Sequence, residues 1–136
     1  MELTSNDNHI QAVDSCVLLR VIDRDNIHQF RQAMQLFLSG RDLYVDGVVI
    51  AEVVHVLTKE SMSRARIVEN LRVLLYNPVF IWDKDFFKPI FDEYLMHPSL
   101  SFDDCIIAAR VAMKGYTPLW TFDRKLANQS EAAKLL

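Results

Sequence analysis

Apolar residues recur along the chain at two spacings, one typical of helices and one typical of strands. In residues 63–76, Ile67, Leu71, Leu74 and Leu75 follow an i, i+4, i+7, i+8 pattern, which forms one apolar stripe on a helix. Short apolar runs that end at a polar residue alternate with such segments and predict strands. The predicted helices are 15–22, 25–38, 47–57, 63–76, 84–96 and 101–114, with a short one from 124. The predicted strands are 9–13, 42–45, 79–82 and 119–122.

The segment 47–57 fits either kind of element. Its β-branched residues favour a strand, whereas its length and Asp46, a suitable N-cap, favour a helix. We predict a helix, partly because of the resemblance given below. Strands then alternate with helices, which indicates an α/β fold with a mainly parallel sheet flanked by helices. Ligands of such sheets bind outside the carboxyl ends of the strands.

Composition limits the class of protein. The 136 residues are 51% hydrophobic and 24% charged, which excludes a disordered chain and predicts a single domain over residues 1–136. We expect residues 1–8, which are polar, to be a frayed N-terminal extension. Cys16 and Cys105 fit no zinc or disulfide pattern and are expected as free thiols. No signal peptide or membrane span is apparent, so we expect a soluble, cytoplasmic protein.

The charge balance argues against one kind of nucleic-acid binder. Fifteen basic residues face 18 acidic ones, a net charge of −3, which excludes a protein that holds nucleic acid by charge alone. It does not exclude an enzyme that contacts nucleic acid through metal ions. Whether such metal ions could be bound depends on where the surplus acidic residues lie.

Four acids fall where the predicted sheet could bring them together. Asp14 and Asp123 end the first and last predicted strands, Asp104 lies in the first turn of a helix, and Glu52 lies on another helix. Unpaired carboxylates in one crevice would repel each other, and a divalent cation such as Mg²⁺ would resolve the conflict. Without these four acids, 14 acidic residues face 15 basic ones, so the rest of the chain is close to neutral.

Each of these acids also has a purely structural interpretation. Asp14 and Asp123 could cap the helices that follow them, Asp104 could form a capping box with Ser101, and Glu52 could be a solvated helix residue. Helical spacing places Asp104 in line with an apolar stripe and predicts that it points inward. The same spacing predicts that Asp103 is solvated. The stripe is formed by Ile107, Ala108 and Val111.

Three blocks resemble the PIN-domain family. IQAVDSCVLLRVI is similar to its opening strand and turn, VVIAEVVHVL to its helix with a single Glu, and FDDCIIAARVAMKGYTPLWTFDRKL to its helix followed by a strand that ends in Thr-x-Asp. The resemblance covers about residues 9–128, and the last block is the most specific. Cys16 departs from the family pattern, which often has Asn at this position. A cysteine side chain lacks the hydrogen-bond donor and acceptor that an amide offers.

The resemblance implies a PIN fold and a ribonuclease that depends on Mg²⁺ or Mn²⁺. Small members of the family are often toxins of the VapC type, so it also implies a cognate antitoxin protein and a homodimer. Carried over by motif, the catalytic and metal-binding residues are Asp14, Glu52, Asp104 and Asp123, with Asp14 and Asp104 as the most direct ligands. Ser15 and Thr121 match the accompanying hydroxyl residues.

The sequence offers candidate contacts with the substrate and allows alternative functions. Arg124 and Lys125, beside Asp123, are the first candidates for contacts with RNA phosphates, and no histidine has ligand spacing. A response-regulator receiver is disfavoured because the first strand offers only Asp14. A nuclease of RNA maturation, or a PIN-fold binding module without activity, is not distinguished from a toxin by the sequence.

Overall fold

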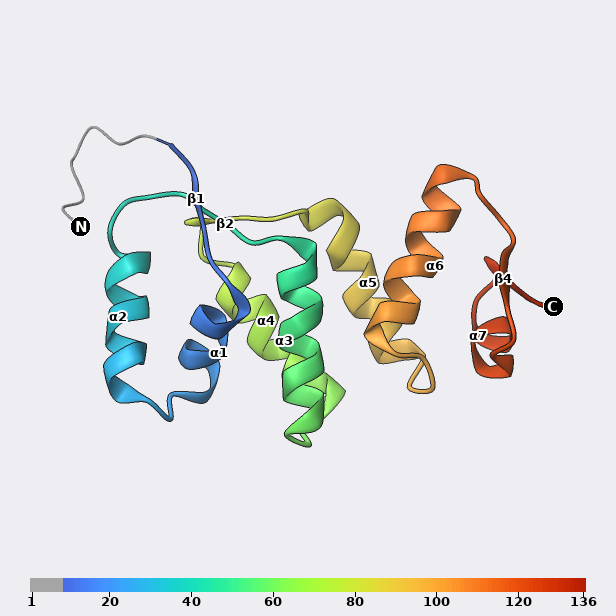
Figure 1. Ribbon diagram of the computed structural model, residues 1–136, viewed down its shortest axis with the longest axis horizontal. Coiled ribbons are helices and arrows are strands. Elements are labelled where there is room, and N and C mark those ends of the chain that lie inside the picture. The colour runs from blue at the N-terminus through green and yellow to red at the C-terminus, as the bar shows by residue number, and fades with distance from the viewer. Residues whose placement is uncertain (1–8) are drawn as a thin grey trace. The chain divides into compact units, whose positions relative to one another are not determined.

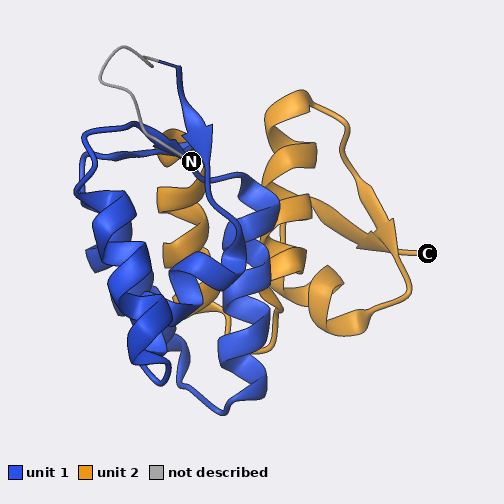
Figure 2. Cartoon of the chain, turned by 60° about the vertical axis from the view of Figure 1, so that its left-hand side comes forward, with its two compact units in different colours: residues 1–83 blue, residues 84–136 orange. Residues whose placement is uncertain are grey.

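The computed structural model describes residues 9–136, and the chain divides into two compact units, residues 1–83 and 84–136 (Figure 2). Both units mix helices with parallel strands, which confirms the predicted α/β class. The predicted N-terminal extension, residues 1–8, lies outside the described residues. The single domain expected over residues 1–136 stays a prediction.

Unit 1 contains a three-stranded parallel sheet and four helices. Its strands are β1 (Gln11–Ala12), β2 (Leu43–Tyr44) and β3 (Phe80–Ile81), in the order β1-β2-β3. Its helices are α1 (Ser15–Asp23), α2 (Ile27–Phe37), α3 (Gly47–Lys59) and α4 (Arg64–Leu75), and Figure 1 follows this alternation from blue to green. These bounds agree with the predicted elements to within two residues, except that the strands are shorter.

Apolar side chains on one face of this sheet are covered by helices. Leu43 and Phe80 pair across β2 and β3 and are both buried, and the ring of Phe37 from α2 packs edge-on against Phe80 with centroids 4.9 Å apart. Tyr44, the next residue of β2, is exposed, as the alternation of side chains along a strand requires. The core therefore lies between one face of the sheet and the helices.

The ambiguous segment after β2 is a helix, as predicted. Within α3, Ile50, Val53, Val54 and Leu57 are buried at helical spacing, and Asp46 caps the helix by accepting from the Val48 N–H at 2.9 Å. The cap and the apolar stripe together outweigh the lower helix propensity of the β-branched residues, which amounts to a few tenths of a kcal/mol each, roughly.

Unit 2 consists of α5 (Lys84–Met96), α6 (Phe102–Lys114), β4 (Leu119–Thr121), α7 (Arg124–Gln129) and β5 (Ala133–Leu135). An aromatic cluster joins its first two helices, because the ring of Phe102 lies against those of Phe91 and Tyr94 with centroids 5.8 and 5.4 Å away. Helix α6 ends at Gly115, whose φ of 71° is the left-handed conformation that glycine adopts without strain.

The last strand is absent from the sequence-based prediction. Residues 133–135 form β5, which pairs in parallel with β4 so that Trp120 lies opposite Lys134. The segment has neither a period-2 pattern nor a turn signal of its own. It becomes a strand because β4 provides the partner, which local pattern cannot reveal.

Candidate functional site

Asp14 follows β1 and caps α1. Its Oδ1 atom accepts from the backbone N–H of Ser15 and from the Ser15 hydroxyl, whose oxygen lies 3.0 Å away. The structural interpretation of Asp14 as a cap is therefore correct, and its carboxylate contacts Ser15. The carboxylate itself is exposed, while Ser15 is buried beneath it.

Glu52 lies on the exposed side of α3. Ile50 and Val53 of the same helix are fully buried and anchor it, while Glu52 itself is exposed. Asp14 and Glu52 both belong to unit 1, whereas Asp104 and Asp123 belong to unit 2.

Asp104 does not point into the apolar stripe as the spacing predicted. It forms both bonds of a capping box, with its N–H donating to the Ser101 hydroxyl at 3.1 Å and its Oδ2 accepting from the Ser101 N–H at 3.2 Å. Ile107, part of the predicted stripe, is 46% exposed, and the buried side of α6 is instead formed by Phe102, Cys105 and Ala108. The cap draws the carboxylate toward the helix end, so Asp104 is only partly buried.

Asp123 follows β4 and caps α7. Its Oδ1 accepts from the N–H groups of Lys125 and Leu126 at 2.9 and 3.4 Å. The Asp123 N–H donates to the hydroxyl oxygen of Thr121 at 2.9 Å, so Thr121 fixes the backbone that carries the acid. Arg124 and Lys125 are exposed beside it.

The three aspartates share one property that matters for metal binding. Each uses a single carboxylate oxygen for capping, namely Oδ1 of Asp14, Oδ2 of Asp104 and Oδ1 of Asp123. Among residues 9–136, the second oxygen of each accepts no hydrogen bond, and none of the four acids forms an ion pair. Capping therefore orients these carboxylates and leaves one oxygen of each available to a hard cation. Carboxylate oxygens are the ligands that Mg²⁺ and Mn²⁺ prefer.

Within either unit, the described part of the chain contains no group of three or more His, Cys, Asp or Glu arranged around a metal position.

Tyr44 and Asp46 form a polar pair that sequence reasoning missed. The Tyr44 hydroxyl donates to Oδ2 of Asp46 at 2.8 Å, while the other Asp46 oxygen caps α3. This hydrogen bond raises the pKa of the Tyr44 phenol, and partial desolvation and the charges of Asp46 and Asp83 raise it further. The pair ties the end of β2 to the helix that carries Glu52. The available sequence signal for this pair was the position of Tyr44, an aromatic residue two positions before the N-cap residue Asp46.

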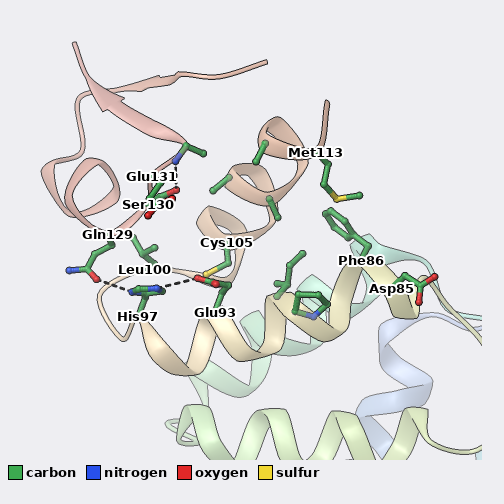
Figure 3. Close-up of a pocket in the computed structure, with 16 residues that line it drawn as sticks. Asp85, Phe86, Glu93, His97, Leu100, Cys105, Met113, Gln129, Ser130 and Glu131 are labelled. Carbon is green, nitrogen blue, oxygen red and sulfur yellow. Dashed lines mark hydrogen bonds and ion pairs between the residues drawn. The ribbon is translucent and has the colours of Figure 1, made fainter. Parts of the chain in front are cut away.

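A pocket of about 650 Å³ lies within unit 2, bordered by α5, α6, the end of α7 and the residues after it (Figure 3). Its walls are mainly apolar, with His97 at one end. The His97 ring nitrogens lie 2.9 Å from Gln129 Oε1 and 3.1 Å from Glu93 Oε2, so this histidine joins α5 to the end of α7. None of the four acids is among the described residues that line the pocket, which separates it from the predicted chemistry.

A smaller groove of about 290 Å³ lies between α1 and α2 and is lined in part by Cys16 and Arg20. Arg20 pairs with Asp23 at 3.4 Å and donates to Gln29, so its charge is already engaged. Cys16 is an exposed free thiol, and Cys105 is a buried one, as expected. The Asp14 carboxylate is held by Ser15 rather than by residue 16, so the departure at Cys16 leaves its orientation intact.

Parallel strands that alternate with helices, with Asp14 and Asp123 just after β1 and β4, define an α/β protein. The chain belongs to the PIN domain family, whose model matches residues 12–132 and so spans both units. PIN domains are generally nucleases that use divalent metal ions. No curated protein matches the chain. Among the helices of residues 9–136, none has the length and apolar content needed to cross a membrane.

Proposed function

We propose that this protein is a ribonuclease that hydrolyses RNA phosphodiester bonds with Mg²⁺ or Mn²⁺. Asp14, Glu52, Asp104 and Asp123 are its metal-binding and catalytic residues. The observation that supports this most strongly is the state of the three aspartates, each oriented by a cap and each with one carboxylate oxygen that accepts no hydrogen bond among residues 9–136.

A bound divalent ion would supply a Lewis acid for the phosphodiester and a more acidic water as the nucleophile. Asp14 and Asp104 are its most direct ligands in this proposal, with Glu52 and Asp123 completing the set. Ser15 fixes the Asp14 carboxylate, and Thr121 fixes the backbone of Asp123. Glu52 is exposed on α3, so it can orient the attacking water and accept its proton. Arg124 and Lys125 hold the phosphate backbone beside Asp123.

Cleavage of single-stranded RNA by the purified protein tests this proposal. We expect cleavage with Mg²⁺ or Mn²⁺, no cleavage with EDTA, and recovery when metal is restored. Asp14→Asn should lose nearly all activity and keep its fold, because the amide oxygen can still accept the cap hydrogen bonds. Equal cleavage by the wild type and Asp14→Asn would overturn the assignment.

We further propose that the biological role is that of a VapC-type toxin in the cytoplasm, neutralised by a cognate antitoxin protein and acting as a homodimer. The resemblance to small single-domain family members supports this. Expression should arrest growth, and co-expression of a small DNA-binding protein encoded by the neighbouring gene should relieve the arrest. Growth unaffected by an active enzyme would favour RNA maturation, and a protein that binds metal or RNA without cleaving would be a binding module.

A further inference from the structure

Asp14 and Asp46 occupy equivalent positions at one edge of the unit 1 sheet. Strand β1 pairs with β2 so that Ala12 lies opposite Tyr44, and each aspartate follows its strand by two residues. The backbone pairing continues beyond that point, because the Val13 N–H donates to the Tyr44 carbonyl oxygen at 3.1 Å. Both aspartates also have extended backbones, with φ −88° and ψ 165° for Asp14 and φ −67° and ψ 150° for Asp46. The two carboxylates therefore leave neighbouring strands at the same edge and on the same side of the sheet.

The carboxylate of Asp46 differs from that of Asp14 in its hydrogen bonds. Its Oδ1 accepts from the Val48 N–H at 2.9 Å, and its Oδ2 accepts from the Tyr44 hydroxyl at 2.8 Å. Asp14 accepts hydrogen bonds at Oδ1 alone. A cation bound by Asp14 would therefore lie beside a second carboxylate that two donors hold in place. All these contacts lie within unit 1.

We propose that Asp46 strengthens the binding of a divalent ion at Asp14 through its negative charge, without acting as a ligand. Neighbouring strands lie about 4.8 Å apart, so an ion on the Asp14 carboxylate is within about 10 Å of Asp46. At that distance one negative charge tightens the binding of a divalent ion about three- to tenfold at low ionic strength. This inference rests on the proposed function, because it concerns the metal ion that Asp14 binds there.

Calorimetric titration of the full chain with Mn²⁺ tests the proposal without requiring cleavage. Asp46→Asn removes the charge and keeps both hydrogen bonds, since the amide oxygen can cap α3 and the amide nitrogen can donate to the Tyr44 oxygen. We expect this variant to bind Mn²⁺ about three- to tenfold more weakly than the wild type in about 10 mM salt. The difference should shrink in about 1 M salt, where charges act over only about 3 Å. Wild-type affinity of Asp46→Asn at low salt would overturn the proposal.

Tyr44→Phe separates the charge of Asp46 from its structural role. This variant loses one hydrogen bond and keeps the charge, so its Mn²⁺ affinity should be no weaker than that of the wild type. If the pair served only to fix α3, the order would be reversed, with weaker binding by Tyr44→Phe and wild-type binding by Asp46→Asn. A loss in Asp46→Asn that persists undiminished in about 1 M salt would make Asp46 a ligand, which also contradicts the proposal.

Asp42→Asn is the matched control. Asp42 precedes β2, so it lies at the opposite end of this strand from Asp46, about 13 Å away over four extended residues. Its replacement removes the same charge from the same strand and should leave the Mn²⁺ affinity within about twofold of the wild type. Equal losses for Asp42→Asn and Asp46→Asn would show an effect of net charge alone and would count against the proposal.

RNA cleavage distinguishes failure of this inference from failure of the proposed function. If the wild type binds Mn²⁺ and cleaves RNA but Asp46→Asn binds Mn²⁺ as the wild type does, this inference alone fails. If the variants bind Mn²⁺ in the expected order but no RNA is cleaved, the proposed function fails and the role of Asp46 stands. If the wild type binds no Mn²⁺, both fail.

Discussion

Asp104→Asn should reduce metal-dependent RNA cleavage by about a hundredfold or more, while α6 remains folded. Replacing residues that merely support metal ligands costs about 10- to 100-fold, and a ligand itself should cost at least the upper figure. The Asn oxygen can still accept from the Ser101 N–H, so the capping box survives. Loss of the charge at the helix N-terminus should cost only about 0.3–1 kcal/mol of stability. Initial cleavage rates and denaturant unfolding measure the two effects.

Asp103→Asn is the matched control for this prediction. Asp103 is the neighbouring acid in the first turn of α6 and is exposed. Its replacement removes the same charge from the same helix end, so the loss of stability should be similar. Cleavage should stay within about twofold of the wild type, as expected for surface substitutions that leave the fold intact. If Asp103→Asn lost as much activity as Asp104→Asn, the effect would come from helix stability or general charge rather than from a metal ligand.

Phe102→Ala should lower the free energy of unfolding by about 3–5 kcal/mol, the range for removing a buried aromatic side chain. Phe102 is 5% exposed, and its ring lies against those of Phe87, Phe91 and Tyr94 at 6.3, 5.8 and 5.4 Å. The truncation leaves a cavity that three large rings cannot fill by small movements. Because Phe102 begins the helix that carries Asp104, cleavage should fall as well. Urea unfolding followed by circular dichroism measures the loss.

Tyr116→Ala removes a comparable ring and serves as the control. Tyr116 is 71% exposed just beyond the end of α6, so its loss should change stability by no more than about 0.5 kcal/mol. A similar loss for the two variants would show that Phe102 is not the centre of the unit 2 core.

The helices were predictable because each combines a periodic apolar stripe with a recognisable end. Ser63 and Ser101 precede α4 and α6 as caps, and Gly115 ends α6. Strand β5 was not predictable, since its formation depends on pairing with β4 rather than on its own residues. The same holds for the contact of Trp120 with Lys134, which joins residues fourteen positions apart in the chain.

The identities of the site residues came from motif order, but their local roles were harder to foresee. Caps at Asp14 and Asp123 were foreseen as alternatives to metal binding, yet in the structure each cap uses only one oxygen, so the two roles are compatible. The capping box of Asp104 with Ser101 was also foreseen and is confirmed, and it turns the carboxylate toward the helix end rather than inward as the helical spacing predicted. Tyr44 was missed because its hydrogen bond to Asp46 depends on side-chain geometry.

The proposed function requires that Asp14, Glu52, Asp104 and Asp123 together bind a divalent metal ion. Calorimetric titration of the full chain with Mn²⁺ tests it most directly, using Asp14→Asn from unit 1, Asp104→Asn from unit 2 and Asp103→Asn as the control. We predict saturable binding by the wild type and by Asp103→Asn, and at least about tenfold weaker binding by each of the other two variants. Wild-type affinity in either Asp14→Asn or Asp104→Asn, or no binding by the wild type, would contradict the claim.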